Sequence, residues 1–183
     1  MSESEAAPES LDDVLRSDHA AILAAAASLR TNTDTAAIGE LFAALCADVV
    51  RHFVAEEQYL LPSVREQLDG GERISDESFA EHERIEQLLK RLDDDDTTDD
   101  RIAAAVSELE SALREHVDAQ ESTVLPTLVE ALDQAELNRL GEGMLGAEQL
   151  APTHPRSIVV KSATLSKLTS WVTGLVEKSL DAR

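Results

Sequence analysis

The chain repeats itself, and the repeated segments carry its histidines. Residues 52–68 read HFVAEEQYLLPSVREQL and residues 116–132 read HVDAQESTVLPTLVEAL, an offset of 64 positions. A second match, at an offset of 63, pairs Asp18-His19 with Glu81-His82. Four segments therefore each carry one histidine at an equivalent place, and such self-similarity is typical of a structure built from two related halves. Four helices with four equivalent histidines favour a paired metal site inside a helical bundle.

The composition agrees with a helical fold. The chain is 43% hydrophobic but 3% aromatic, and it has seven glycines and five prolines. Ala and Leu dominate the apolar residues, which is typical of helices with aliphatic cores. We expect bundle helices at about Ser10–Arg30, Thr35–Leu61, Ser75–Leu92 and Asp99–Leu125. Pro62 is expected to kink or break the second of these helices, and Pro126 to break the fourth. The predicted fold is all-α, an up-down four-helix bundle with extra C-terminal helices.

The segments outside the bundle are predicted from local signals. Residues 1–9 are expected to be a disordered N-terminus, residues 10–132 the bundle, and residues 133–183 a C-terminal helical extension. The extension begins with a helix at about 134–148 that Gly141, Gly143 and Gly146 weaken. It ends with a helix at about Ser157–Leu180, whose apolar residues fall on one face. We expect this last helix to dock on the bundle or on a second subunit, which would give a homodimer.

Charge and cysteine content restrict the partners and the compartment. The formal net charge of −21 repels phosphates and anionic lipids, so neither nucleic acid nor a membrane is an expected partner. Cys46 is the single cysteine, which is typical of a reducing cytoplasm. The acidic N-terminus has no basic and apolar regions typical of a signal peptide. We therefore expect a cytoplasmic protein.

Carboxylates follow three of the histidines at informative spacings. His52 and Glu56 are four residues apart, and so are His82 and Glu86, which places each pair on one helix face. His116 is followed by Gln120 at four residues and by Glu121 at five. A π-helical turn near residues 116–121 would align His116 with Glu121. The alternative is that Gln120 faces the site and Glu121 faces solvent.

These motifs resemble those of the hemerythrin, or HHE cation-binding, family. The resemblance rests on DHAAI at 18–22, HFVAEEQYLLP at 52–62, AEHERIEQLL at 80–89 and HVDAQESTVLP at 116–126. It implies two iron ions bridged by an oxo or hydroxo group, with Mn or Zn as substitutes. It further implies a ligand set of His19, His52, Glu56, His82, Glu86, His116 and Glu121. Glu86 departs from the oxygen-carrying hemerythrins, where the corresponding residue is a histidine.

The resemblance implies chemistry with small oxygen species. Our first hypothesis is a non-haem di-iron protein that binds, senses or breaks down O2, peroxide or NO, with a role in oxidative stress. A catalase-like or oxidase activity is one form of this hypothesis. The alternative is an iron-binding or iron-sensing module without catalysis. A helical interaction protein without metal is disfavoured, because buried unpaired glutamates would be costly.

Overall fold

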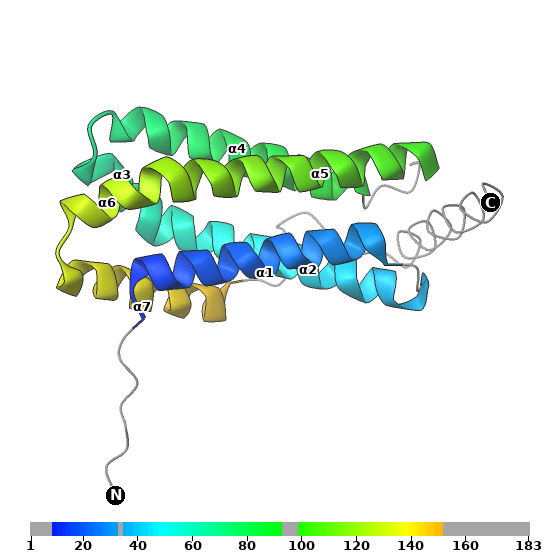
Figure 1. Ribbon diagram of the computed structural model, residues 1–183, viewed down its shortest axis with the longest axis horizontal. Coiled ribbons are helices and arrows are strands. Elements are labelled where there is room, and N and C mark those ends of the chain that lie inside the picture. The colour runs from blue at the N-terminus through cyan, green and yellow to red at the C-terminus, as the bar shows by residue number, and fades with distance from the viewer. Residues whose placement is uncertain (1–8, 33–34, 93–98, 152–183) are drawn as a thin grey trace, which may run out of the picture.

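The computed structural model describes residues 9–32, 35–92 and 99–151. Helices α1 and α2 form one antiparallel pair and α4 and α5 another, and the two pairs pack lengthwise on each other (Figure 1). Short helices continue α2 and α5 beyond π-helical turns, and a further helix, α7, lies against α1 and α2. The elements are α1 (Leu11–Thr31), α2 (Thr35–Ala55), α3 (Leu61–Gln67), α4 (Gly71–Leu92), α5 (Asp99–Ala119), α6 (Leu125–Ala131) and α7 (Gln134–Leu150). The predicted all-α, up-down bundle is confirmed.

Local capping signals explain two of the helix starts. Ser10 and Asp13 form a capping box at α1, in which the Ser10 hydroxyl accepts from the Asp13 backbone N–H. Asp133 caps α7 by accepting from the backbone N–H of Glu136. The third long helix was expected to begin at about Ser75, and this was wrong. That helix begins at Gly71, and buried Ser75 donates from inside it to the carbonyl of Leu61.

The two prolines of the repeat do not break their helices. A π-helical turn, η1, spans Glu56–Leu60 before Pro62, and a second, η2, spans Gln120–Val124 before Pro126. The flanking residues keep right-handed helical dihedrals, so the chain passes through each proline as a helix. Proline lacks an N–H and its ring collides with the carbonyl four residues earlier, and the wider turn removes that collision. The expectation of a break was therefore wrong.

A layer of polar side chains divides the core into two apolar clusters. The first apolar cluster, toward the α1–α2 connection, contains Phe42, Leu45, Cys46, Leu88 and Leu113 among others. The second apolar cluster, at the opposite end of the bundle, contains Leu11, Leu15, Leu60 and Leu125, together with Met144 of α7. Between them lie four buried histidines and Glu56. Two of the histidines come from the middle of α1 and α4, the other two come from the last turns of α2 and α5, and Glu56 begins the π-helical turn that follows α2. Burial of a polar layer at this depth requires partners for its atoms.

Helix α7 runs unbroken through its three glycines. Gly141 faces the start of α1, and a Cβ there would collide with the backbone of Glu9 and Ser10. The glycine thus permits close approach of two backbones. None of the described helices is long and apolar enough to cross a membrane. The predicted disordered N-terminus (apart from Glu9) and the predicted helix at Ser157–Leu180 lie outside the described residues.

Candidate metal centre

Three histidine side chains close around one buried carboxylate. Glu56 is fully buried, and its Oε1 lies 3.1 Å from Nε2 of His52. Its Oε2 lies 2.9 Å from Nε2 of His82 and 3.6 Å from Nε2 of His116. The two oxygens of Glu56 therefore face different histidines, as a carboxylate shared between two cations would.

His19 completes the cluster. Ligating atoms of His19, His52, Glu56 and His116 all lie within 4.8 Å of one another, and all four side chains are buried. The ring of His19 stands edge-on to that of His52, with centroids 5.0 Å apart. The structure thus brings together, from four different helices, the four histidines of the repeat. We call His19, His52, Glu56, His82 and His116 the histidine cluster.

The outward nitrogen of each histidine faces a carboxylate from a neighbouring helix. Nδ1 of His19 lies 2.8 Å from Glu121 and Nδ1 of His82 lies 3.1 Å from Glu57. The contacts are longer at the other two rings, 3.4 Å from His52 to Asp18 and 3.5 Å from His116 to Glu81. A carboxylate on Nδ1 fixes the orientation of the ring and favours a proton on Nδ1, so that Nε2 can bind a metal once it has lost any proton it carries.

These outer carboxylates obey the twofold repeat. Asp18 and Glu81 each precede a histidine by one residue, and each contacts the histidine of the next long helix. Glu57 and Glu121 occupy equivalent positions of the repeat, and each contacts a histidine of the other half. Glu57 contacts His82 of α4, and Glu121 contacts His19 of α1. Sequence reasoning missed this role for Asp18, Glu57 and Glu81. The signal was present, because an acidic residue before the histidine recurs in both halves.

Several inward atoms of the cluster have no hydrogen-bond partner. Among the described residues these are Nε2 of His19, His52 and His116 and Oε1 of Glu56. His52 Nε2 and Glu56 Oε1 are close, but their geometry is not that of a hydrogen bond. Buried polar atoms are rarely left unpaired without a reason. Within the cluster His82 Nε2 is hydrogen-bonded to Glu56 Oε2, at 2.9 Å. Convergent imidazole and carboxylate groups whose other inward atoms are unpaired fit a borderline divalent or trivalent cation such as iron, manganese or zinc.

The electrostatics of the metal-free cluster favour an ion pair at its centre. Burial opposes the charge on His52, but Glu56 and Asp18 outweigh it and raise the pKa of His52 to about 10. Burial would raise the pKa of Glu56, yet His52, His116 and His82 together hold it well below its usual value. The pKa of His19 is lowered, first by burial and then by the charge of His52. Metal binding must therefore displace a proton from His52.

The second half of the repeat differs from the first at the inner carboxylate. Gln120 occupies the position equivalent to Glu56, is buried, and has neither amide atom hydrogen-bonded. Glu121 is 29% exposed, and its carboxylate contacts Nδ1 of His19 and the guanidinium of Arg16. A π turn exists, but it spans Gln120–Val124 rather than the predicted region near residues 116–121, and it does not bring Glu121 into the inward group. Glu121 therefore lies outside the inward group, as a support of His19, and it does not point freely into solvent.

Glu86 is also placed apart from the cluster. Its carboxylate is 36% exposed and lies 3.9 Å from the ammonium of Lys90. Helix α4 runs antiparallel to α2, so a four-residue step from His82 leads toward the first apolar cluster. The same step from His52 leads toward the second. The spacing gave the correct face of the helix but the opposite direction along the bundle.

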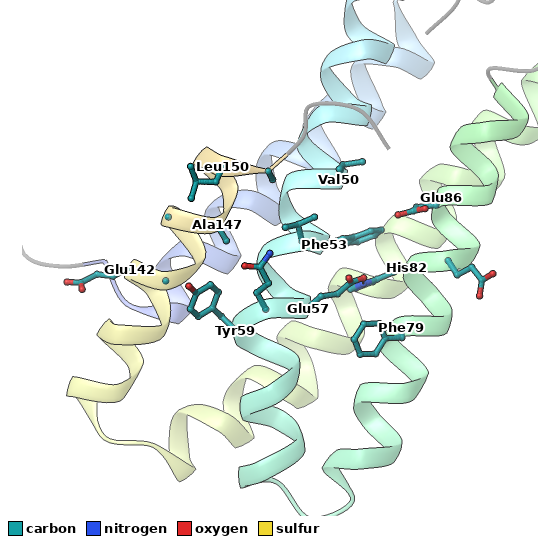
Figure 2. Close-up of a pocket in the computed structure, with 16 residues that line it drawn as sticks. Val50, Phe53, Glu57, Tyr59, Phe79, His82, Glu86, Glu142, Ala147 and Leu150 are labelled. Atoms are coloured by element: carbon teal, nitrogen blue, oxygen red, sulfur yellow. The ribbon is translucent and has the colours of Figure 1, made fainter. Parts of the chain in front are cut away.

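Two aromatic residues and one groove border the cluster. The ring of Phe53 stacks on His82 with centroids 3.9 Å apart. Both residues line a groove of about 730 Å³ between α2, α4 and α7 (Figure 2). Tyr59 lines this groove and packs against the second apolar cluster. Cys46 is buried in the first apolar cluster.

Comparison with known proteins agrees with this geometry. The profile of the hemerythrin HHE cation binding domain matches residues 10–128. An uncharacterized hemerythrin-like protein of Schizosaccharomyces pombe is 23% identical over 108 residues, which cover 58% of this chain and 53% of that protein. A protein of Nostoc named DNA nickase is 27% identical over 118 residues, 64% of this chain and 33% of the relative. The chain thus spans about half the length of the Schizosaccharomyces pombe protein and about one third of the length of the Nostoc protein. No solved structure matches it significantly.

Proposed function

Because the chain belongs to the hemerythrin HHE cation-binding domain family, we propose that its histidine cluster binds two iron ions and uses them on small oxygen species. The species meant are O2, peroxide and NO. The observation that carries the proposal is the convergence of His19, His52 and His116 with Glu56, each with an unpaired atom directed inward, while His82 is hydrogen-bonded to the same carboxylate. Manganese and zinc suit the same donors and are the substitutes to test.

Side chains of the protein itself hold the metal-binding groups in position. The outer carboxylates hold the imidazole rings, and Glu56 offers one oxygen to each side of the cluster. Bound iron would supply a redox-active centre for oxygen species. The four histidines and Glu56 provide five side chains, fewer than two six-coordinate ions can accept, so positions remain for a small ligand. Neutral Gln120 keeps the negative charge of this interior low on the α5 side.

The proposal is tested with the iron-loaded protein and peroxide. We expect peroxide consumption by the wild type and its loss in His116→Ala, because that histidine faces Glu56 from α5. His154→Ala is the matched control, since this fifth histidine lies off the repeat register. Equal turnover in wild type and His116→Ala would refute the assignment of the chemistry to this cluster. Absence of turnover by loaded wild type would refute the enzymatic version.

The same cluster supports a second candidate function, iron sensing without catalysis. The observation in its favour is that the polar layer separates the two halves of the core, so occupancy bears on the stability of the whole bundle. Here we expect iron to raise the melting temperature strongly while peroxide is left unchanged. A large rise together with rapid peroxide turnover would instead favour the first function.

We do not extend the nicking activity in the name of the Nostoc relative to this chain. The shared region is a third of that protein, and a net charge of −21 repels DNA phosphates. The expected result is no nicking of supercoiled plasmid by the iron-loaded protein. Nicking that disappears in His52→Ala would overturn this. We further propose a cytoplasmic location, because the single cysteine fits a reducing compartment.

A further inference from the structure

The groove beside His82 is an apolar surface that the described part of the chain leaves open. Three large apolar side chains are exposed among the described residues, and two of them, Phe79 at 40% and Leu150 at 88%, line this groove. Phe53, Val54 and Ala147 add further apolar surface between them (Figure 2). A concentration of exposed apolar groups of this kind marks a surface that another element covers.

The α7 side of the groove has room for a close neighbour. Gly143 and Gly146 both line it. The ring of Tyr59 packs against Gly143, but a Cβ at Gly146 would meet nothing within 4 Å. Glycine in a helix lowers the stability by about 0.5–1 kcal/mol relative to alanine. The open space above Gly146 would allow the backbone of another element to approach closely. The groove also reaches Leu150 and Ala151, where the described chain ends. Whatever follows Ala151 therefore starts at the groove itself.

The charge of the groove complements the remaining chain. The rim is acidic, with Glu57, Glu83, Glu86 and Glu142. Residues 152–183 carry five basic and two acidic side chains, a formal charge of +3 in a chain whose total is −21. Three of the four lysines, Lys161, Lys167 and Lys178, lie in this stretch. A basic segment next to an acidic rim is favoured electrostatically over any acidic partner.

We propose that residues 157–180 of the same chain dock in this groove. Their apolar side chains recur at helical spacing, so one face of a helix presents them together. They are Leu165, Leu168, Val172, Leu175 and Val176. The five preceding residues span up to about 17 Å when extended, which lets the segment turn back onto the groove. The charge favours this segment over an acidic separate protein, and the covalent continuity favours the segment of the same chain over that of a second copy.

Docking there would cover the His82 side of the histidine cluster. His82 and its outer partner Glu57 both line the groove, and Phe53 stacks on His82. The docked segment would shield this edge from water. The proposal does not depend on metal, because every contact that supports it belongs to groups outside the inward face of the cluster.

Trp171 makes the proposal testable, because it is the single tryptophan and lies within the segment. In the full-length, metal-free wild type we expect blue-shifted Trp171 emission and slow trypsin cleavage at Lys161 and Lys167. Phe79→Glu should shift the emission to the red and speed cleavage by about tenfold or more, the scale of one lost apolar contact. Val129→Glu is the matched control, since Val129 is 37% exposed but lies outside the groove.

Unchanged emission and cleavage in Phe79→Glu would overturn the proposal, as would solvent-like emission in the wild type. Far-ultraviolet circular dichroism of both variants checks that the bundle is intact. Leu150→Glu is a second variant with the same expected result, because its side chain is almost wholly exposed and its loss spares the core. A monomeric mass in light scattering, with emission independent of concentration, supports docking within one chain. Dimerisation that tracks the blue shift would assign the groove to the segment of a second copy and refute the proposal.

Discussion

Replacement of Glu56 by glutamine removes the charge at the centre of the cluster and keeps the shape. In the metal-free protein this carboxylate lies 3.1 Å from His52 and 2.9 Å from His82. The pKa of His52 is raised from 6.5 to about 10, a difference that corresponds to roughly 5 kcal/mol. Asp18 contributes part of this shift, so we assign about 3 kcal/mol of the free energy of unfolding to Glu56, in the range for breaking one buried pair.

The same reasoning fixes the pH dependence. A histidine whose pKa is raised on folding stabilises the protein fully below its unfolded value of 6.5, and this contribution is lost as the pH rises through about 10. The wild type should therefore lose stability across this window, whereas Glu56→Gln should lose much less. The difference between the two proteins should be largest near about pH 6 and should shrink toward about pH 10.

The assay is urea unfolding of chelator-treated protein, followed by helical circular dichroism. Glu66→Gln makes the same chemical change at an exposed position of α3 and should leave stability unchanged. A Glu56→Gln protein that loses less than about 1 kcal/mol near pH 6, or that loses the same amount near pH 10, would refute the ion pair.

Three other predictions concern the support of the cluster and the packing of α7. Glu57→Gln removes the partner of His82 Nδ1 and should weaken metal binding about 10–100-fold in chelator competition, while Glu66→Gln should not; equal affinities would contradict the supporting role. Gly141→Ala should lower the free energy of unfolding by about 1–3 kcal/mol, because the new Cβ would collide with backbone atoms at the start of α1. Gly146→Ala faces open space and should be neutral or stabilising. If urea unfolding showed Gly146→Ala to be the less stable of the two variants, this packing would be refuted. Burial and then Asp18 raise the pKa of Glu148 to about 7, so the wild type loses stability as the pH rises from 4.5 through about 7. The increase in the free energy of unfolding from Glu148→Gln should therefore grow across this window, and an increase that is independent of pH would contradict the prediction.

The histidine cluster followed from the sequence because it depends on positions within a repeat. Equivalent residues on equivalent helices lie at one level of a bundle, so His19, His52, His82 and His116 meet once the fold is helical. Glu56 followed for a similar reason, since a four-residue step keeps one helix face.

The placements that differ from expectation depend on two helices at once. Helical spacing gives an angle around one axis, but it does not give the direction of a neighbouring helix, and for that reason it did not indicate that Glu86 lies apart from the histidine cluster. Glu121 contacts His19 across helices, a pairing that no spacing within its own helix encodes. The prolines were read as breaks because a single sequence does not reveal the π turns that accommodate Pro62 and Pro126.

Metal content tests the central claim most directly. The protein would be purified aerobically from iron-supplemented cells, and its iron per chain would be measured by mass spectrometry beside His52→Ala and the His154→Ala control. The account predicts two iron ions per chain in the wild type and in His154→Ala, with near-ultraviolet absorption from iron, and little iron in His52→Ala. A folded wild type that takes up no iron, or a His52→Ala protein that binds as much as the wild type, would contradict it.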